Sequence, residues 1–451
     1  MHEWVDALVF SGVDPGSLAA FRIVFGLLMA VAAVRFVALG WVDEFYIRPT
    51  FHFTWELLPW VQPLPGRLMS LLFVALALLA LAVAAGFQYR LCAGLFFVGF
   101  TYVELIDKTT YLNHYYLASL LSGLLMVLPA HRALSVDALR RPALRASTVP
   151  AWTVNLLRFQ LAVVYVFAGL AKLNTDWLLH AQPMRIWLSA RSDVPVVGWL
   201  FAQSWVADAF SWGGAVYDLG IVFLLLKRGT RAGAYLTVVL FHAMTAWLFP
   251  IGMFPWIMIG ATLIFFSPDW PRRLLRRAKT EVPAGAATSV PPWVTVSLLA
   301  VYAAVQIVVP LRAYWPGADP EWTYRGFNFS WRVMIVEKAG YTELAASDPA
   351  TGRRWLVPMR DYVTERQEKM MAQDPFMIRT LARHVAEDLR ARGVASAEVR
   401  AESFAALNGR PLQRLIDPRV DLARPSPPGW ILPFNRDRAE PEFPDVLLDQ
   451  D

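Results

Sequence analysis

Long apolar stretches are the feature that most constrains how this chain can fold. A helix needs roughly 17–25 consecutive apolar residues to cross the hydrocarbon core of a bilayer. Nine stretches reach or approach this length, namely Ser17–Leu39, Leu68–Phe87, Leu91–Ile106, Tyr115–Leu128, Trp152–Leu170, Ala209–Leu226, Ala232–Phe249, Met253–Phe266 and Trp293–Pro310. The fourth and the eighth stretches are short, so we expect them to be tilted, re-entrant or buried among the other helices. The pattern predicts a polytopic α-helical membrane protein with eight or nine transmembrane helices, nine being the expected count.

Charged residues are few in this chain and unevenly placed. They make up 17% of its 451 residues, whereas an ordinary soluble domain carries about 25%. From Leu311 onwards, however, the chain holds 20 Lys and Arg and 21 Asp and Glu residues. We therefore expect two bodies: a transmembrane domain over residues 1–310 and a water-soluble domain over residues 311–451. A disulfide scaffold is excluded, because Cys92 is the single cysteine.

The basic residues of the first body fall in alternate loops. Loops 132–145, 227–231 and 272–279 are rich in Lys and Arg and would share one side of the membrane. The positive-inside rule makes that side cytoplasmic and, with nine spans, places the C-terminal domain on the outer face. The net charge of +6 is thus explained by contact with a lipid bilayer, and no nucleic acid is predicted as a partner. We expect no cleavable signal peptide at the N-terminus.

Three segments of the C-terminal domain suggest an α+β fold. Thr323–Val336 is rich in aromatic and β-branched residues, which favours a strand. Asp361–Gly393 has helical periodicity interrupted at Asp374, and Ala397–Ala406 alternates as a strand does.

Two clusters of polar residues lie at the predicted outer edge of the membrane part. One runs from Glu104 to Tyr116 and the other from Ala168 to Trp177. Ionisable residues at membrane depth are default candidates for function. Against this, Lys172 is also explained as a lysine that reaches from a helix end to the interface. His114 and His242 are also explained as hydrogen-bonded packing residues.

Four separated motifs resemble one known family. They are DKTTYLNHYYL (Asp107–Leu117), FAGLAKLNTDWL (Phe167–Leu178), VPLRAYWPGADPEWTYRGFNFSWRVM (Val309–Met334) and IDPRVDLA (Ile416–Ala423). In this order they resemble the vitamin K-dependent γ-glutamyl carboxylases, whose membrane part is the horizontally transferred transmembrane (HTTM) domain. The resemblance covers nearly the whole chain, from about Ala20 to Ala423, and indicates a short bacterial-type member in the inner (cell) membrane.

The resemblance implies a reaction and its participants. A reduced naphthoquinone, here reduced vitamin K such as menaquinol or phylloquinol, is deprotonated and oxygenated to its epoxide. This oxidation is coupled to carboxylation of a glutamate in a peptide or protein. O₂ and CO₂ are co-substrates, and no metal is predicted.

The resemblance also implies roles for individual residues. Lys172 is the expected base, and we hypothesise that it is neutral in the resting site because apolar surroundings disfavour an ammonium ion. His114 is expected to donate a hydrogen bond to a quinone oxygen as charge develops there. The remaining candidates for binding quinone or substrate are Asn113, Asp107, Lys108, Tyr111, Trp331, Arg325, Arg332 and Lys338.

Departures from the family leave the function open. The His and Arg that help to hold the substrate glutamate in animal members correspond here to Val336 and Lys338. One alternative is therefore a menaquinol epoxidase or oxidase without glutamate carboxylation. A second alternative, from a different class, is a non-catalytic membrane transporter or receptor. A transporter would be favoured by inverted repeats with interrupted helices, and the sequence shows no such repeat.

Overall fold

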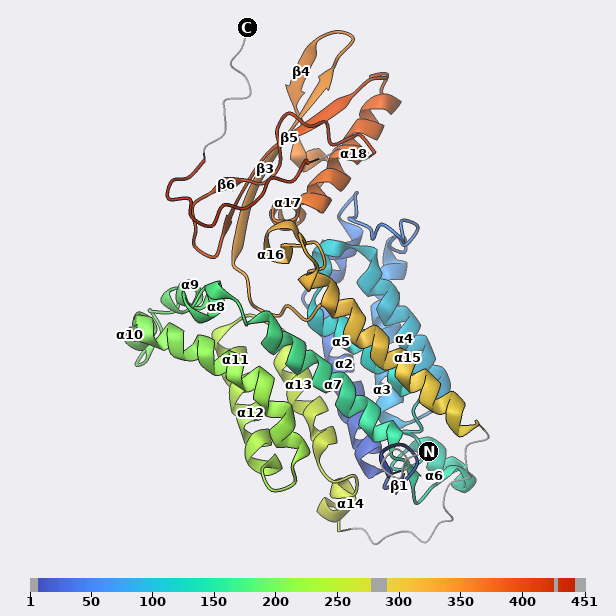
Figure 1. Cartoon of the computed structure of the whole chain (residues 1–451). Helices are drawn as coiled ribbons and strands as arrows, with labels where there is room; N and C mark the ends of the chain where they lie inside the picture. The colour runs from blue at the N-terminus through green and yellow to red at the C-terminus, as the bar shows by residue number, and fades with distance from the viewer. Residues whose placement is uncertain (1–6, 277–289, 426–428, 443–451) are drawn as a thin grey trace.

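The computed structural model describes residues 7–276, 290–425 and 429–442. The longer helices in the first part of the chain pack against one another in a bundle (Figure 1). They are α2 (Gly16–Ala38), α3 (Arg67–Ala85), α4 (Tyr89–Ile106), α5 (Asn113–Val127), α7 (Trp152–Ala171), α11 (Ser204–Leu226), α12 (Arg231–Leu248), α13 (Phe254–Thr262) and α15 (Pro292–Leu311).

Six of these helices are long and apolar enough to cross a membrane: α2, α3, α4, α7, α11 and α15. The other three predicted stretches also form helices, but α5, α12 and α13 do not meet both criteria in the part of the chain that the structure describes. The helical membrane architecture is therefore confirmed, and the predicted count of nine spans is not.

Short elements close the two ends of the helical bundle. The end away from the C-terminal domain carries α6 (Val136–Arg140), α14 (Trp270–Leu274) and the two-stranded ladder of β1 (Gly12–Val13) with β2 (Val149–Pro150) (Figure 1). Near the other end lie α8 (Thr175–Leu178), α9 (Met184–Ser189) and α10 (Gly198–Phe201). Arg132, Arg145 and Arg272 line one cavity at the first end, so two of the basic loops do lie together, opposite the C-terminal domain.

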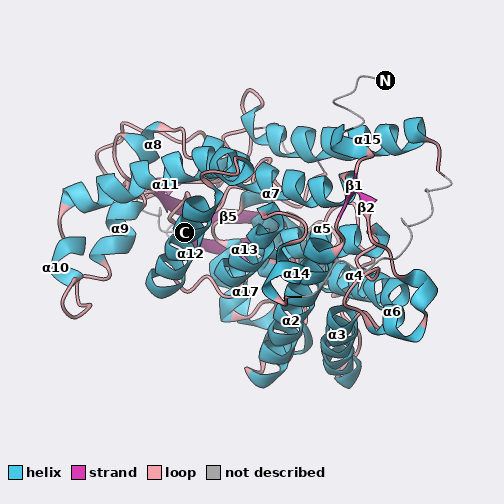
Figure 2. Ribbon diagram, turned by 90° about the horizontal axis from the view of Figure 1, so that it is seen from below, coloured by secondary structure: helices cyan, strands magenta, loops and turns pink. Residues whose placement is uncertain are grey.

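Small residues set the closest helix contacts. A Cβ atom on Gly26 of α2 would lie 2.6 Å from the carbonyl oxygen of Ala80 in α3, so only glycine permits this approach. At the opposite extreme, α15 lies at one edge of the bundle beside α7 (Figure 2). Most of its side chains are exposed, and the hydroxyl of Tyr302 donates a hydrogen bond of 2.6 Å to the side-chain oxygen of Gln160 in α7. An apolar helix exposed in this way suits contact with lipid.

The C-terminal domain contains a four-stranded antiparallel sheet in the order β4-β3-β5-β6. The strands are β3 (Lys338–Asp348), β4 (Arg353–Leu356), β5 (Glu398–Leu407) and β6 (Gln413–Arg414). Helix α17 (Glu365–Met371) precedes α18 (Pro375–Ala391), and α18 packs its apolar face on the sheet. The predicted helical segment, its break at Asp374 and the strand at 397–406 are thus confirmed. The break lies at Asp374 because its carboxylate caps α18 by accepting from the Phe376 backbone N–H.

The prediction of a strand over Thr323–Val336 is wrong. After the short helix α16 (Pro320–Thr323) this segment is a loop that connects the bundle to the sheet, and the strand begins at Lys338. Its non-glycine residues Phe329, Trp331 and Met334 have positive φ values of 62°, 58° and 49°, which a strand does not allow. Aromatic side chains of this segment pack on the helical bundle instead, since Trp331 stacks on Tyr116 of α5 with ring centroids 4.9 Å apart.

Candidate active site

Lys172 is held at the end of α7 by three neighbouring groups. Its side chain is 6% exposed, and its Nζ donates to the Asp218 carboxylate at 2.7 Å and to the Ala168 carbonyl at 3.2 Å. The Nζ atom also lies 5.2 Å from the centroid of the Trp177 ring. A snorkelling lysine would carry its amine to the interface, whereas this amine is turned inward onto a carboxylate.

Asp218 reaches Lys172 because α7 and α11 approach closely at this level. A Cβ atom on Gly169 would lie 2.7 Å from the side chain of Leu219, so the small residues before Lys172 do permit close helix contact, as expected. Sequence reasoning missed Asp218 and treated the surroundings of Lys172 as apolar. A signal was present, because Asp218 is the one Asp, Glu, Lys or Arg in the predicted span Ala209–Leu226, and charged residues at membrane depth are functional candidates by default.

Lys172 and Asp218 line an apolar cavity of about 320 Å³. Its other walls come from α7, α8, α9, α11, α12, α13 and the loop at 333–334. They include Tyr165, Trp177, Trp187, Phe210, Tyr217, Phe241, Met244, Phe249, Phe254, Met258 and Met334. Ligand cavities of this kind are mostly apolar with a few polar groups that fix orientation. The residues present therefore fit a flat, apolar quinone ring whose polar edge faces the amine.

Further polar atoms at this cavity have few or no partners. The Nε2 atom of His242 lies 3.4 Å from the Tyr165 hydroxyl, while its Nδ1 has no hydrogen-bond partner in the structure. Among the described residues, the Tyr217 hydroxyl likewise makes no hydrogen bond of normal distance and angle, and both His242 and Tyr217 line the cavity. The packing role expected for His242 is thus incomplete, since buried polar atoms are normally satisfied. These two atoms are candidates to contact a ligand.

His114 lines a second cavity, of about 340 Å³, beside the first. Asn113 shares this second cavity, and the two cavities have Ile251, Phe254, Val333 and Met334 in common. The Phe254 ring lies between the two histidines, 5.9 Å from the His114 ring and 5.7 Å from the His242 ring. The structure therefore brings Lys172 and His114 to adjoining cavities rather than to one wall.

Asp107, Lys108 and Tyr111 lie outside the residues that line these two cavities. The Asp107 carboxylate is fully buried and accepts hydrogen bonds from the backbone and hydroxyl of Thr109 and from the Gln367 side chain in α17, with His52 Nδ1 at 3.1 Å. The Lys108 amine lies over the Trp55 ring. The Tyr111 hydroxyl accepts from the backbone N–H of Phe329 at 2.8 Å. These contacts join the membrane bundle to the C-terminal part.

The predicted carboxylate-binding residues are engaged elsewhere. Arg332 is buried and forms an ion pair of 2.7 Å with Glu321. The Lys338 amine donates to the carbonyl of Trp322 at 2.5 Å and lies over the Trp322 ring. Burial lowers the pKa of Lys338 to about 7, although the charge of Asp374 opposes this effect. Arg325 is exposed and lies over the Phe376 ring, so each of the three cations has a different partner.

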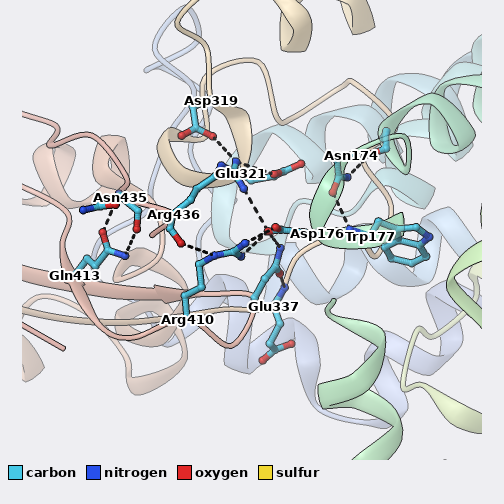
Figure 3. Close-up of polar contacts among 12 residues, drawn as sticks. Asn174, Asp176, Trp177, Asp319, Glu321, Glu337, Arg410, Gln413, Asn435 and Arg436 are labelled. Carbon is cyan, nitrogen blue, oxygen red and sulfur yellow. Dashed lines mark hydrogen bonds and ion pairs between the residues drawn. The ribbon is translucent and has the colours of Figure 1, made fainter. Parts of the chain in front are cut away.

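Asp176, four residues after Lys172, is bound by the C-terminal domain. Its carboxylate accepts two hydrogen bonds from Arg410, at 2.6 and 2.8 Å, and one from Asn408 at 3.0 Å. Arg436 lies 3.4 Å away. In Figure 3 these side chains converge on Asp176, while the Trp177 ring points away from them. Burial raises the pKa of Asp176, but the bonds from Arg410 and Asn408 outweigh it and hold this pKa below its usual range.

Comparison with known families finds two matches along the chain. A family model described as the HTTM domain matches residues 10–270, and one described as the lumenal domain of vitamin K-dependent gamma-carboxylase matches residues 292–437. The first match contains both cavity-lining residues Lys172 and Asp218. No solved structure matches the chain.

Proposed function

We propose a function for this chain on the basis of its family. The chain belongs to the HTTM-domain proteins, and its C-terminal part matches the lumenal domain of vitamin K-dependent gamma-carboxylase. The chain is proposed to be a vitamin K-dependent γ-carboxylase-like enzyme that oxidises a reduced naphthoquinone to its epoxide and couples this to the carboxylation of glutamate with CO₂. One observation carries the proposal: a buried amine, Lys172, faces an apolar cavity that suits a quinone.

In this proposal Lys172 accepts a proton at Nζ and Asp218 prepares it to do so. The carboxylate fixes the amine at the cavity wall and offers a second position for a proton along the 2.7 Å hydrogen bond. An amine that alternates between two protonation states is a suitable base, whereas a guanidinium group is not. The aromatic wall excludes water, which strengthens electrostatic interactions at the site.

Reduced vitamin K, when bound, supplies the electrons for the oxidation. Trp177, Phe241 and Phe254 are proposed to hold its ring, and Tyr165, Tyr217 and His242 to orient its polar edge. His114 is proposed to stabilise developing negative charge from the neighbouring cavity, with Asn113 beside it. The bilayer is proposed to hold the prenyl chain.

The test is epoxide formation by the purified chain in detergent with reduced menaquinone and O₂. Lys172→Ala and Lys172→Arg should both abolish epoxide formation, the second because guanidinium does not release its proton at ordinary pH. A small amine added to Lys172→Ala should restore part of the activity. Lys227→Arg, at an exposed position on the opposite end of α11, is the matched control. Activity near that of the parent in Lys172→Arg would refute the proposed base.

Epoxidation without carboxylation is the second candidate function. It is favoured by the ion pair of Arg332 with Glu321 and by the hydrogen bond of Lys338 to the Trp322 carbonyl, since each of these cations already has a partner within the protein. Incorporation of labelled CO₂ into a glutamyl peptide during quinol oxidation distinguishes the two candidates. Epoxide formed with no incorporation, at saturating peptide, would favour epoxidation alone.

The location of the domains is also part of the proposal. We place the membrane domain at residues 1–310, in a bacterial inner membrane, and the domain at 311–451 on the outer face. The gathering of Arg132, Arg145 and Arg272 at the opposite end of the bundle supports this orientation. A reporter fused after Asp451 should read as extracytoplasmic, and a cytoplasmic reading would reverse the orientation.

A further inference from the structure

The cavity beside the Lys172 site contains two arginines. Arg35 lies near the end of α2 and Arg366 lies in α17 of the C-terminal domain, and both line the cavity that holds His114. Neither was a candidate from the sequence. Both are partly exposed, so the cavity is reached from the surface on their side.

Two stacked aromatic rings hold the two guanidinium groups in one place. The rings of Trp41 and Phe45 are stacked with centroids 5.8 Å apart. The Cζ atom of Arg35 lies 4.8 Å from the Trp41 ring centroid, and that of Arg366 lies 4.2 Å from the Phe45 ring centroid. Guanidinium groups stack on aromatic faces and keep their N–H edges free for other acceptors.

These two arginines differ from those that join the domains elsewhere. Arg332 and Arg410 form ion pairs with Glu321 and Asp176. Among the described residues, Arg35 and Arg366 have no carboxylate within ion-pair distance, and their one hydrogen bond runs from Arg366 to the Thr109 carbonyl at 3.1 Å. Two positive charges thus share a cavity without a negative charge in contact.

The cavity adjoins the place where the proposed base lies. It shares Phe254, Val333 and Met334 with the Lys172 cavity, and its wall also carries His114 and Asn113. A molecule held by the two arginines therefore has its other end close to the Lys172 side.

We propose that Arg35 and Arg366 bind the side-chain carboxylate of a glutamyl substrate in this second cavity. The proposal rests on the proposed function and names the site at which its second substrate is held. Paired guanidinium groups are well suited to a carboxylate, because each presents N–H donors in a plane that matches its two oxygens. Their separation between α2 and α17 makes the site depend on docking of the C-terminal domain.

The occupant is inferred from charge, size and position. A volume of about 340 Å³ accommodates a short side chain but not a folded anionic partner. With its carboxylate at the arginines, the remainder of the side chain would occupy the rest of the cavity, whose wall includes Phe254 and Met334. These two residues also line the Lys172 cavity.

Binding is tested directly, with the full chain in detergent and no quinone present. The probes are N-acetyl-glutamate α-amide, which has one carboxylate, and N-acetyl-glutamine α-amide, its neutral isostere, with affinity measured by calorimetry. We expect the first to bind and the second to bind at least about 10-fold more weakly, as charged hydrogen bonds are lost. Arg35→Gln and Arg366→Gln should each weaken the first probe by about 10-fold or more. Equal binding of the two probes would overturn the proposal.

Arg48→Gln is the matched control, because Arg48 is an exposed arginine near the same end of the bundle and pairs with Asp43. Its affinity for the glutamate probe should equal that of the parent. Should the Gln variants fail to fold, phenylglyoxal labelling of the parent chain gives an independent answer. The glutamate probe should protect Arg35 and Arg366, read by peptide mass spectrometry, and leave Arg48 labelled. Equal labelling of all three with and without the probe would overturn the site.

The outcomes separate this site from the proposed function. Probe binding that depends on Arg35 and Arg366, together with an active Lys172→Arg variant, would keep the site and remove the proposed base. Absence of probe binding, together with loss of epoxidation in Lys172→Arg, would remove the site and leave the quinol oxidation in place.

Discussion

The turn after α7 has two sides, and each side buries one ion pair. On the bundle side Lys172 meets Asp218, and on the domain side Asp176 meets Arg410 with Asn408 and Arg436 nearby. Lys172 and Asp176 are four positions apart along the chain. The domain-side carboxylate has donors on both oxygens, whereas the bundle-side pair keeps one face open to a cavity.

The difference indicates two roles for buried charge. A carboxylate surrounded by donors has no capacity left for a ligand, so the Asp176 cluster serves attachment of the C-terminal domain. A pair at a cavity wall retains capacity to exchange a proton with a bound molecule. Because burying charge is costly even when it is paired, the Lys172–Asp218 pair, which faces a cavity and joins no domain, is the one for which a functional reason is needed.

Among the substitutions that test this comparison, Asp218→Asn should have the largest effect. An amide at this position still accepts a hydrogen bond but takes no proton, so the rate of quinol epoxidation should fall by roughly 100-fold, a typical contribution of proton-transfer groups. KM for the quinol should change less than kcat, since the cavity shape is kept. Steady-state kinetics at several pH values checks this, and a shifted pH profile would show action through Lys172.

Asp208→Asn is its control, because Asp208 lies on the same helix but is exposed and pairs with Arg185. Both substitutions are isosteric. A loss in Asp208→Asn as large as that in Asp218→Asn would mean that the helix, and not the cavity pair, is sensitive.

Asp176→Asn should act on stability. Removing one partner of a buried pair leaves opposite charges uncompensated, and we expect a loss of about 3 kcal/mol in the free energy of unfolding. Thermal or denaturant unfolding in detergent measures it. Asp319→Asn, where the partner Arg436 is 4.0 Å away and Asp319 is partly exposed, should cost far less.

The same pair predicts a dependence on acid. The pKa of Asp176 is lowered in the folded state, so its contribution is complete above the unfolded pKa of about 3.9 and is lost as the pH falls through the folded value. Asp176→Asn should therefore lose less stability than the parent on acidification. Equal acid sensitivity of the two proteins would contradict attachment through this charge.

Lys338→Met extends the comparison to a single buried cation. The Lys338 amine has, among the described residues, no carboxylate in hydrogen-bond contact. Its folded pKa of about 7 lies below the unfolded value of about 10.4. The unfolded chain therefore binds more protons between these values, and the stability of the parent should rise with pH across this window. The slope of this rise is on the order of 1.4 kcal/mol per pH unit, which gives a few kcal/mol across the window. The variant should lack this rise. Unfolding midpoints from pH 6 to 10 measure the difference, and identical slopes would contradict it.

The smallest effect should come from Arg48→Gln. This arginine pairs with Asp43 at 2.6 Å, but their side chains are 71% and 48% exposed. Exposed pairs contribute about 0–1 kcal/mol, so stability should change by less than about 1 kcal/mol. A larger loss would mean that exposed pairs at this end of the bundle matter as much as the buried ones.

Apolar length predicted the helices well because crossing a bilayer imposes a length on each segment. The break at Asp374 and the strand at 397–406 were also predicted, since capping and alternation are local signals. The strand predicted at Thr323–Val336 was wrong because aromatic content was read as strand propensity. In that segment Trp331 packs onto Tyr116 across the domain boundary, and no local pattern encodes such a contact.

The candidate site was predicted in part. The sequence singled out Lys172, His114 and Asn113, and all three line the adjoining cavities. The sequence did not single out Asp218, which lies 46 positions after Lys172. It also did not single out Arg35 in the transmembrane part or Arg366 in the C-terminal domain. Lys338 and Arg332, predicted to bind a substrate carboxylate, are bonded within the protein to Trp322 and Glu321, and their substrate roles stay predictions.

The sequence by itself determined the membrane architecture, the division of charge and the family, because hydropathy, composition and motifs are properties of the linear chain. Only the tertiary structure decided which charges are satisfied. A side chain's partners depend on distances of a few ångström between segments far apart in sequence, set by helix contacts such as that of Gly169 with Leu219. Those contacts turn Lys172 toward Asp218 and a cavity, and Asp176 toward Arg410, although the two residues lie in one short motif.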